Sequence, residues 1–293
     1  MLKRVIPVAA LAAISMGCQN APPAPPAADA IWLNGPIITV DDEHPEADAV
    51  AVRDGRIVAV GKRKDVLRHQ ADTTAMHDLH GRTLLPGFVD AHGHVFFTGF
   101  QAMSANLLPP PDGGVSDVAS LVETLKTFAK DSLLREEFGL IYGFGYDDSQ
   151  LAEKRHPTRA ELDQVSQDQP VLVIHQSAHF GVVNSAGLKQ LGITADSDNP
   201  KGGVIVKDPA TGEPTGLLEE NAFFMALGKM FPKMSPQQAI AMLQQGEKLY
   251  TRYGYTTLQD GRSAPLHVKI AQAAANAGAL RADIVSYPDI LNP

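Results

Sequence analysis

The stretch Pro86–Phe97, PGFVDAHGHVFF, places His92 and His94 directly after a short apolar run. The run contains Phe88 and Val89 and predicts a strand that is buried on both faces. On extended backbone, residues i and i+2 project to the same side, so both imidazoles would emerge together where the strand ends. Imidazole nitrogens about 2 Å from one ion are normal ligands of Zn²⁺, although a zinc site needs three or four ligands. Spacing alone leaves a second interpretation open, in which the two rings only hydrogen-bond to backbone.

Asp90 lies on the same side of this strand, one alternation before His92. A carboxylate there could orient a histidine ring or contact the metal itself. In sheets of parallel strands joined by helices, functional side chains collect at the carboxyl ends of the strands. The sequence therefore predicts a metal site at the mouth of this strand.

Residues 30–85 have the pattern of short strands and tight turns. Asn34-Gly35 and Asp54-Gly55 each stand between apolar runs and predict two-residue hairpin turns, and His80-Gly81 predicts a third turn. We expect a small antiparallel sheet here. After Gly87, apolar runs alternate with helical stretches, which favours parallel βα units.

The sequence predicts several helices, and for three of them it also predicts the capping residues at which they begin. The segment Asp117–Phe138 has helical spacing of its apolar residues. Helix-capping residues stand at three further places: Thr158 with Glu161, Asn184 with Ser185, and Ser235 with Gln238.

The N-terminus predicts export. Lys3 and Arg4 precede the apolar run Val5–Met16, which suits a signal peptide and is shorter than the about 20 residues that span a bilayer. Cys18 is the only cysteine and a Pro/Ala-rich stretch follows it, as at the lipidation site of a bacterial lipoprotein. We therefore expect a lipoprotein signal at residues 1–18, a tether at 19–29 and a periplasmic or outer-membrane location. A plain secretory signal with an incidental cysteine is the alternative.

Composition excludes some partners. The chain has 293 residues, 44% of them hydrophobic, which is enough for a substantial core. Its net charge of −8 argues against binding to a nucleic-acid backbone, which requires clustered Lys and Arg. The expected contact with a membrane is through the lipid anchor only.

Five segments in a fixed order carry a resemblance to a known family. They are VRDGRIVAVG (52–61), LLPGFVDAHGH (84–94), GYDDSQLAEKRHPTRAELDQVSQDQPVLVIHQSAHFGVVNSAGL (145–188), GEPTGLLEENA (212–222) and YGYTTLQDG (253–261). The chain resembles the amidohydrolase superfamily, and within it the amidohydrolase 3 branch, which includes N-substituted formamide deformylases. The similarity extends from about Ala30 to Tyr287.

The resemblance implies an α/β fold: a (β/α)8 TIM-type barrel with an N-terminal β-sandwich layer at residues 30–85. Residues 86–293 would form the N-terminal part of the barrel, with an insertion at about 105–230. Only about three barrel strands can be counted before Pro293, so we expect a partial barrel. The missing part would belong to a longer chain or be replaced by a partner, such as a second copy.

The resemblance also implies metal-dependent hydrolysis of a C–N bond in a small, amide-like substrate. One or two divalent ions, usually zinc, would lower the pKa of a bound water. His92 and His94 match the family's first metal ligands. The family's catalytic aspartate matches no residue of this chain.

Three further residues are candidates for the site. His179 matches a family position at the substrate mouth, although histidine serves equally well in capping and packing. Glu220 could bridge metal ions, or it could be a solvated residue at a helix start. Asp260 follows a predicted strand and would line the pocket. The rival hypotheses are a non-catalytic envelope lipoprotein, an inactive fragment, and a protein that only binds a small ligand in the cleft.

Overall fold

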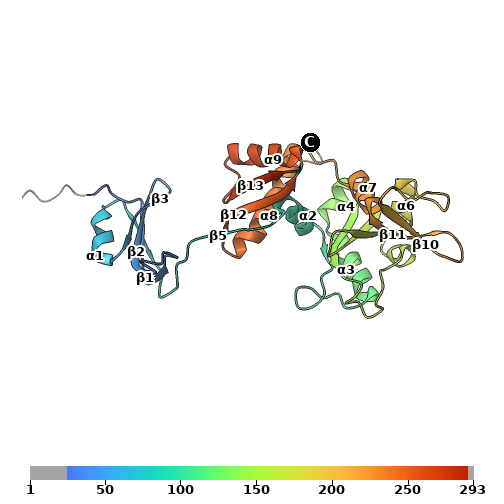
Figure 1. Ribbon diagram of the computed structural model, residues 1–293, viewed down its shortest axis with the longest axis horizontal. Helices are drawn as coiled ribbons and strands as arrows, with labels where there is room; N and C mark the ends of the chain where they lie inside the picture. The colour runs from blue at the N-terminus through green and yellow to red at the C-terminus, as the bar shows by residue number, and fades with distance from the viewer. Residues whose placement is uncertain (1–24, 290–293) are drawn as a thin grey trace, which may run out of the picture. The chain divides into compact units, whose positions relative to one another are not determined.

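The computed structural model describes residues 25–289. The predicted signal peptide and the predicted lipidation at Cys18 lie outside these residues. Contacts divide the chain into two compact units with the division after Pro86 (Figure 1). Among the described residues, no helix has both the length and the apolar character needed to cross a membrane.

The first unit contains one four-stranded sheet in the order β3-β2-β1-β4. Its strands are β1 (Ala30–Ile38), β2 (Glu46–Arg53), β3 (Arg56–Gly61) and β4 (Ala75–Asp78), and α1 (Arg63–Val66) with the short 3-10 helix η1 (Leu67–His69) follows β3. Neighbouring strands are antiparallel except β1 and β4, which are parallel. The described residues of this unit form a single sheet, so the two-sheet sandwich remains a prediction.

Two of the predicted turns are present, and one prediction was wrong. Asp54-Gly55 joins β2 to β3 with φ angles of +50° and +70°, as a two-residue hairpin turn requires. His80-Gly81 also forms a turn at positive φ. Asn34-Gly35, in contrast, lies inside β1, where the register shifts between Leu33 and Ile37. The positive φ of Asn34 (+65°) serves a β-bulge, which needs the same backbone freedom as a turn.

The second unit contains two sheets. The larger has six strands in the order β10-β11-β9-β8-β7-β6, and the smaller, described below, has three. Strands β6, β7 and β8 are parallel, and β8, β9, β11 and β10 are antiparallel. The strands are β6 (Ala105–Asn106), β7 (Ile141–Tyr146), β8 (Val171–His175), β9 (Phe180–Val183), β10 (Gly203–Lys207) and β11 (Pro214–Glu220). Strands β7 and β8 are buried along their whole length, as expected for central strands.

Five helices accompany this sheet: α3 (Val118–Lys130), α4 (Leu133–Phe138), α5 (Arg159–Leu162), α6 (Ser185–Leu191) and α7 (Asn221–Met230). The segment predicted as one helix is divided into α3 and α4, because Ser132 caps a new helix by accepting from the backbone N–H of Arg135. Thr158 with Glu161 forms the predicted capping box, and Asn184 caps α6. These predictions are confirmed.

A three-stranded parallel sheet in the order β13-β12-β5 carries the histidine pair. Its strands are β5 (Phe88–Val89), β12 (Tyr255–Ser263) and β13 (Asp283–Pro288), and the helices with it are α2 (Val95–Ala102), α8 (Pro236–Arg252) and α9 (Pro265–Asn276). Leu258 of β12 and Ala274 of α9 are fully buried in the shared core. Ser235 and Gln238 form the predicted capping box of α8.

The expected burial of β5 on both faces was wrong. Phe88 is 49% exposed and Val89 is 69% exposed. Strand β5 is an edge strand of a sheet with only three strands, and Val285 and Tyr287 on the other edge strand, β13, are also exposed. Burial depends on what covers a strand, and the described residues leave these side chains uncovered.

Helices α2 and α8 pack with their backbones in contact. A Cβ on Gly99 would lie 2.2 Å from the carbonyl oxygen of Met242, and one on Gly246 would lie 2.3 Å from that of Val95. Both distances are shorter than any real contact, so only glycine fits at either position. Because α2 begins directly after His94, this contact fixes the helix that follows the histidine pair.

Candidate functional site

The two predicted histidines lie together after β5. The ring centroids of His92 and His94 are 5.2 Å apart and the rings are nearly perpendicular, at 86°. The Asp90 carboxylate shapes the turn: Oδ1 accepts from the backbone N–H of His92 (3.2 Å), and Oδ2 accepts from that of Gln259 in β12 (3.3 Å). A Cβ on Gly93 would lie 2.0 Å from Asp90 Oδ2, so a larger residue there would displace the Asp90 carboxylate from its present position. Asp90 therefore orients the backbone of the pair.

His94 has a defined tautomer. Its Nδ1 lies 2.7 Å from the carbonyl oxygen of Gly261. A carbonyl can only accept, so Nδ1 carries the proton and the neutral ring presents an unprotonated Nε2. Metal-binding histidines are oriented in this way, by donating the other ring N–H to a carbonyl or carboxylate. The His94 side chain is thus prepared to act as a ligand through Nε2.

Asp260 lies beneath this turn at the end of β12 and is only 4% exposed. Its carboxylate accepts from the backbone N–H of Phe96 (3.2 Å) and from Ser263 Oγ (2.6 Å), and His267 Nδ1 lies 3.5 Å from Oδ2. Burial raises the pKa of Asp260, but His267, Ser263 and the Phe96 N–H outweigh burial and hold the pKa below its ordinary value. Asp260 is therefore ionised and fixed.

His179 and Glu220 form a second pair. His179 Nδ1 lies 3.0 Å from Glu220 Oε2, and the Glu220 backbone N–H donates to the His179 carbonyl (2.9 Å). Both side chains are about half exposed. Glu220 has φ +50° and ψ −121°, a conformation that side chains with a Cβ adopt at a cost of about 1–3 kcal/mol. The carboxylate is the hydrogen-bond acceptor, so His179 keeps a proton on Nδ1.

A cavity of about 350 Å³ brings His94, His179 and Asp260 together. Its remaining lining residues are Phe97, Ser177, Ala178, Phe224, Leu227, Gly261, Arg262 and His267. Ala178 and Arg262 have positive φ angles, as Glu220 does, so unusual backbone conformations surround this cavity. Such conformations concentrate at functional sites because the surrounding structure must hold them in place. Glu220 does not line the cavity itself, but it contacts His179, which does.

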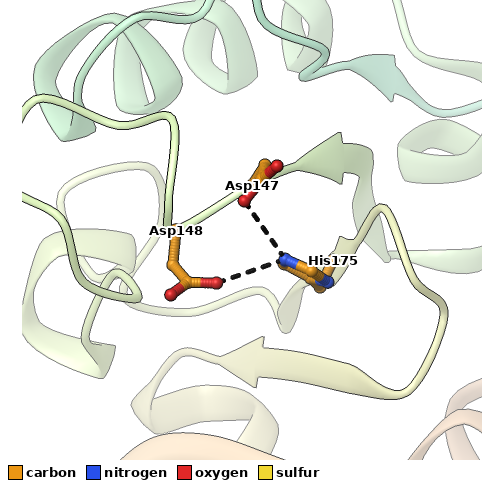
Figure 2. Close-up of side chains that lie close together, drawn as sticks. All are labelled: Asp147, Asp148 and His175. Carbon is orange, nitrogen blue, oxygen red and sulfur yellow. Dashed lines mark ion pairs between the residues drawn. The ribbon is translucent and has the colours of Figure 1, made fainter.

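The described residues contain one group of three or more possible ligand side chains whose donor atoms lie within 4.8 Å of one another. It consists of Asp147, Asp148 and His175 (Figure 2), and not of the predicted set His92, His94 and Glu220. The structure thus brings His92 and His94 together but does not bring Glu220 to them as a third ligand. The assignment of Glu220 to the metal remains a prediction.

The sequence reasoning passed over Asp147, Asp148 and His267. The first two follow the buried strand β7 directly and His175 ends β8, so the rule that side chains gather at the carboxyl ends of parallel strands could have found them. His267 lies near the start of α9, where no spacing pattern distinguishes it from an ordinary helical residue.

Residues 75–291 match the model of the Amidohydrolase family. The chain belongs to this family. It is 31% identical over 253 residues to the N-substituted formamide deformylase of Arthrobacter pascens, covering 85% of this chain and 45% of that protein. It is 34% identical over 207 residues to the putative amidohydrolase YtcJ of Bacillus subtilis, covering 70% of this chain and 37% of that protein.

The fold also resembles solved structures of metal-dependent hydrolases. An uncharacterized metal-dependent hydrolase from Pyrococcus furiosus superposes with a TM-score of 0.64 at 21% identity, covering 88% of this chain and 50% of that one. The chain thus spans about half or less of the length of these relatives. Its fold is mixed α/β, and its structural neighbours are metal-dependent hydrolases.

Proposed function

We propose that this chain carries the first part of the site of a metal-dependent hydrolase that cleaves a C–N bond in a small, amide-like molecule. The observation that carries the proposal is the His94 ring, whose Nδ1–H donates a hydrogen bond to the Gly261 carbonyl, so that Nε2 is left unprotonated beside the His92 ring. A divalent cation, for which zinc is our choice, supplies a lowered water pKa and polarisation of a carbonyl when it is bound.

The predicted ligands His92 and His94 are of a type that zinc binds, but two ligands are fewer than a zinc site requires. His92 and His94 are imidazole ligands, whereas zinc requires three or four ligands. Asp90 holds the turn and Asp260 holds the start of α2, so both act as positioning residues. Glu220 is our candidate for a further ligand, alone or bridging two ions, and the remaining ligands would come from outside this chain.

The cavity suits the substrate side of the reaction. Phe97, Phe224 and Leu227 give it apolar walls that exclude water from a bound acyl or N-alkyl group. His179, whose Nδ1 proton is held by Glu220, can present Nε2 to the substrate. In this role His179 accepts a hydrogen bond from the amide N–H and orients the bond to be cleaved.

The three parallel strands β5, β12 and β13 would be the first strands of a (β/α)8 barrel. Both edge strands carry exposed apolar residues: Phe88, Val89, Val285 and Tyr287. Unpaired strand edges attract further strands. We propose that the remaining strands come from further residues of a longer chain or from a second copy, and that the whole protein is exported and held at the membrane by a lipid on Cys18.

The test is hydrolysis of an N-substituted formamide by the purified protein, measured together with its zinc content. We expect formate release that a chelator abolishes and added zinc restores, and loss of that release in His94→Ala. Zinc content is the readout if this chain alone turns over slowly. Chelator-resistant hydrolysis, or a zinc content that is the same in the parent, His92→Ala and His94→Ala, would overturn the proposal.

A non-catalytic protein that binds a small ligand is the second candidate. It is favoured because, within residues 25–289, no third potential ligand side chain clusters with His92 and His94. It predicts saturable binding of the same formamide without turnover and without dependence on metal.

A further inference from the structure

A second cluster of potential ligands lies at the ends of two neighbouring strands of the six-stranded sheet. Asp147 and Asp148 follow β7, and His175 is the last residue of β8, which pairs with β7 in parallel (Figure 2). Parallel pairing brings the carboxyl ends of both strands to the same edge, so three residues from two separate segments converge. None of them lines the cavity that contains His94 and His179.

The His175 ring points an unused nitrogen into this cluster. The residue is 8% exposed, and its buried Nε2 has no hydrogen-bond partner. Asp148 Oδ1 lies 3.2 Å and Asp147 Oδ1 lies 3.7 Å from that nitrogen, yet neither contact has hydrogen-bond geometry. A buried polar atom without a partner destabilises the folded state. A cation between the three atoms would remove this destabilisation.

The distances suit a small, tetrahedrally coordinated ion. Two ligands that are each about 2.0–2.1 Å from zinc lie about 3.3 Å apart when the site is tetrahedral. The contacts of His175 Nε2 with the two carboxylates, at 3.2 Å and 3.7 Å, bracket this value. His156 Nε2 lies 3.8 Å from Asp148 Oδ1, outside the group of three, and is the nearest further imidazole to that carboxylate that an ion pair records.

Charge also favours a cation here. Among the described residues, no lysine or arginine forms an ion pair with Asp147 or Asp148, so the histidines are their only positively ionisable partners. Asp147 is held by four donors, from the Ser149 backbone and hydroxyl and from the Gln150 and Gln176 amides. Its carboxylate is thus fixed in place before any ion binds. The Asp148 side chain is 34% exposed, which leaves a path of entry.

We propose that Asp147, Asp148 and His175, with His156 as the fourth donor, bind a divalent cation of the zinc class, separate from the ion proposed at His92 and His94. Two imidazoles and two carboxylates are a donor set that Zn²⁺ accepts. The His175 proton then lies on Nδ1, where Ser177 Oγ, 2.8 Å away, accepts it. This bond replaces the contact in which the Ser177 N–H donates to Nδ1 (3.1 Å).

The ion would stabilise the segment that leads from His175 to His179. Ser177 and His179 line the cavity, and Ala178 between them has a positive φ. Coordination of His175 anchors one end of this segment, and the bond between His179 and Glu220 anchors the other. The cation is therefore structural, and it sets the position of a cavity wall.

The experiment uses the full chain with His92→Ala and His94→Ala, which removes the other proposed site. Zinc affinity is measured by competition with a chromophoric chelator, and Co²⁺ absorption reports the geometry. We expect one zinc per chain with tetrahedral Co²⁺ bands. Adding Asp148→Asn should weaken zinc binding by at least about tenfold. Asp168→Asn, which removes the same charge from an exposed position, is the matched control and should leave the affinity unchanged.

Asp148 is chosen because it is partly exposed, so its replacement leaves the fold intact, and thermal unfolding without metal verifies this. At one fixed zinc concentration, zinc should raise the melting temperature of the double variant and of the Asp168→Asn control by the same amount, and that of the Asp148→Asn variant by less. Failure of the double variant to bind zinc would overturn the proposal and leave a His175–Asp148 ion pair. Zinc binding that is equally tight in the Asp148→Asn variant would overturn it as well. Neither result bears on His92 and His94, which are absent from these proteins.

Discussion

His94 and Asp260 lie opposite each other in an isolated antiparallel bridge that joins the turn after β5 to the end of β12. The bridge is reinforced from both sides: the Gly261 N–H donates to the Gly93 carbonyl (2.7 Å), and the Gly261 carbonyl accepts from His94 Nδ1. The position of the histidine pair is therefore set by β12 as much as by its own strand. The bridge thus fixes the backbone of His94 before any ion could bind there.

Zinc retention should depend on both histidines of the pair. We expect His92→Ala and His94→Ala each to lower the affinity for zinc at this site by at least about tenfold, since each removes one imidazole ligand. The measurement is zinc per chain after dialysis against a weak chelator. His44→Ala, at a side chain that is 79% exposed, is the control and should bind as the parent does. A parent-like zinc content in both ligand variants would contradict the prediction.

Asp260 should make stability depend on pH in the acid range. Its pKa is lowered in the folded protein, so its contribution is complete above the ordinary pKa of 3.8 and is lost as the pH falls through the lower, folded value. We expect Asp260→Asn to lower the free energy of unfolding by about 2 kcal/mol at pH 7, because hydrogen bonds to a buried charge contribute about that much. Urea unfolding at pH 7 and at pH 3 should show the difference shrinking at the lower pH. A difference that is the same at both values would contradict this assignment.

At Glu220, substitution by glycine should give a more stable protein than substitution by alanine, which is the reverse of the usual order. At an ordinary position glycine is less stable than alanine by about 0.5–1 kcal/mol. At φ +50° and ψ −121° the Cβ is strained, so we expect Glu220→Gly to be more stable than Glu220→Ala by about 1 kcal/mol. Both variants lack the carboxylate and should lose its bond to His179 equally. The same pair of substitutions at Glu219, which precedes it in β11 without a positive φ, should give the ordinary order in chemical denaturation.

Glu247 should be important for joining α8 to β13. It is 4% exposed, and Oε1 accepts from the backbone N–H groups of Arg281 (2.5 Å) and Ala282 (2.8 Å), just before β13 begins. Glu247→Ala leaves both donors without a partner, so we expect a loss of about 2–4 kcal/mol. The adjacent, exposed Lys248→Ala should change stability by no more than about 0.5 kcal/mol. Equal melting temperatures for the two variants would contradict the prediction.

Local features of the fold were predicted well from the sequence. The capping boxes at Thr158 and Ser235 and the hairpin turn at Asp54-Gly55 are confirmed, because each depends on contacts within a few residues. The juxtaposition of His92 and His94 is confirmed for the same reason. Asn34-Gly35 failed because a bulge and a turn make the same demand on the backbone, so residue type alone cannot separate them.

Features that depend on distant segments were not predictable in this way. The exposure of Phe88 and Val89 follows from the number of strands beside β5, which the residues of β5 do not determine. The contact of His175 with Asp148 requires the parallel pairing of β7 and β8 in one register. His267 approaches Asp260 only because α9 turns back over the end of β12, with Ser263 bonded to the same carboxylate.

The contact between α2 and α8 at Gly99 and Gly246 has a further consequence for how this protein can be altered. Most helix pairs can adjust their spacing by exchanging one side chain for a larger or smaller one. Here no side chain stands between the two backbones, so that means of adjustment does not exist. A change in the position or tilt of the His92 and His94 rings must therefore come from residues of β12 and the loop after it, and not from the packing of α2 against α8.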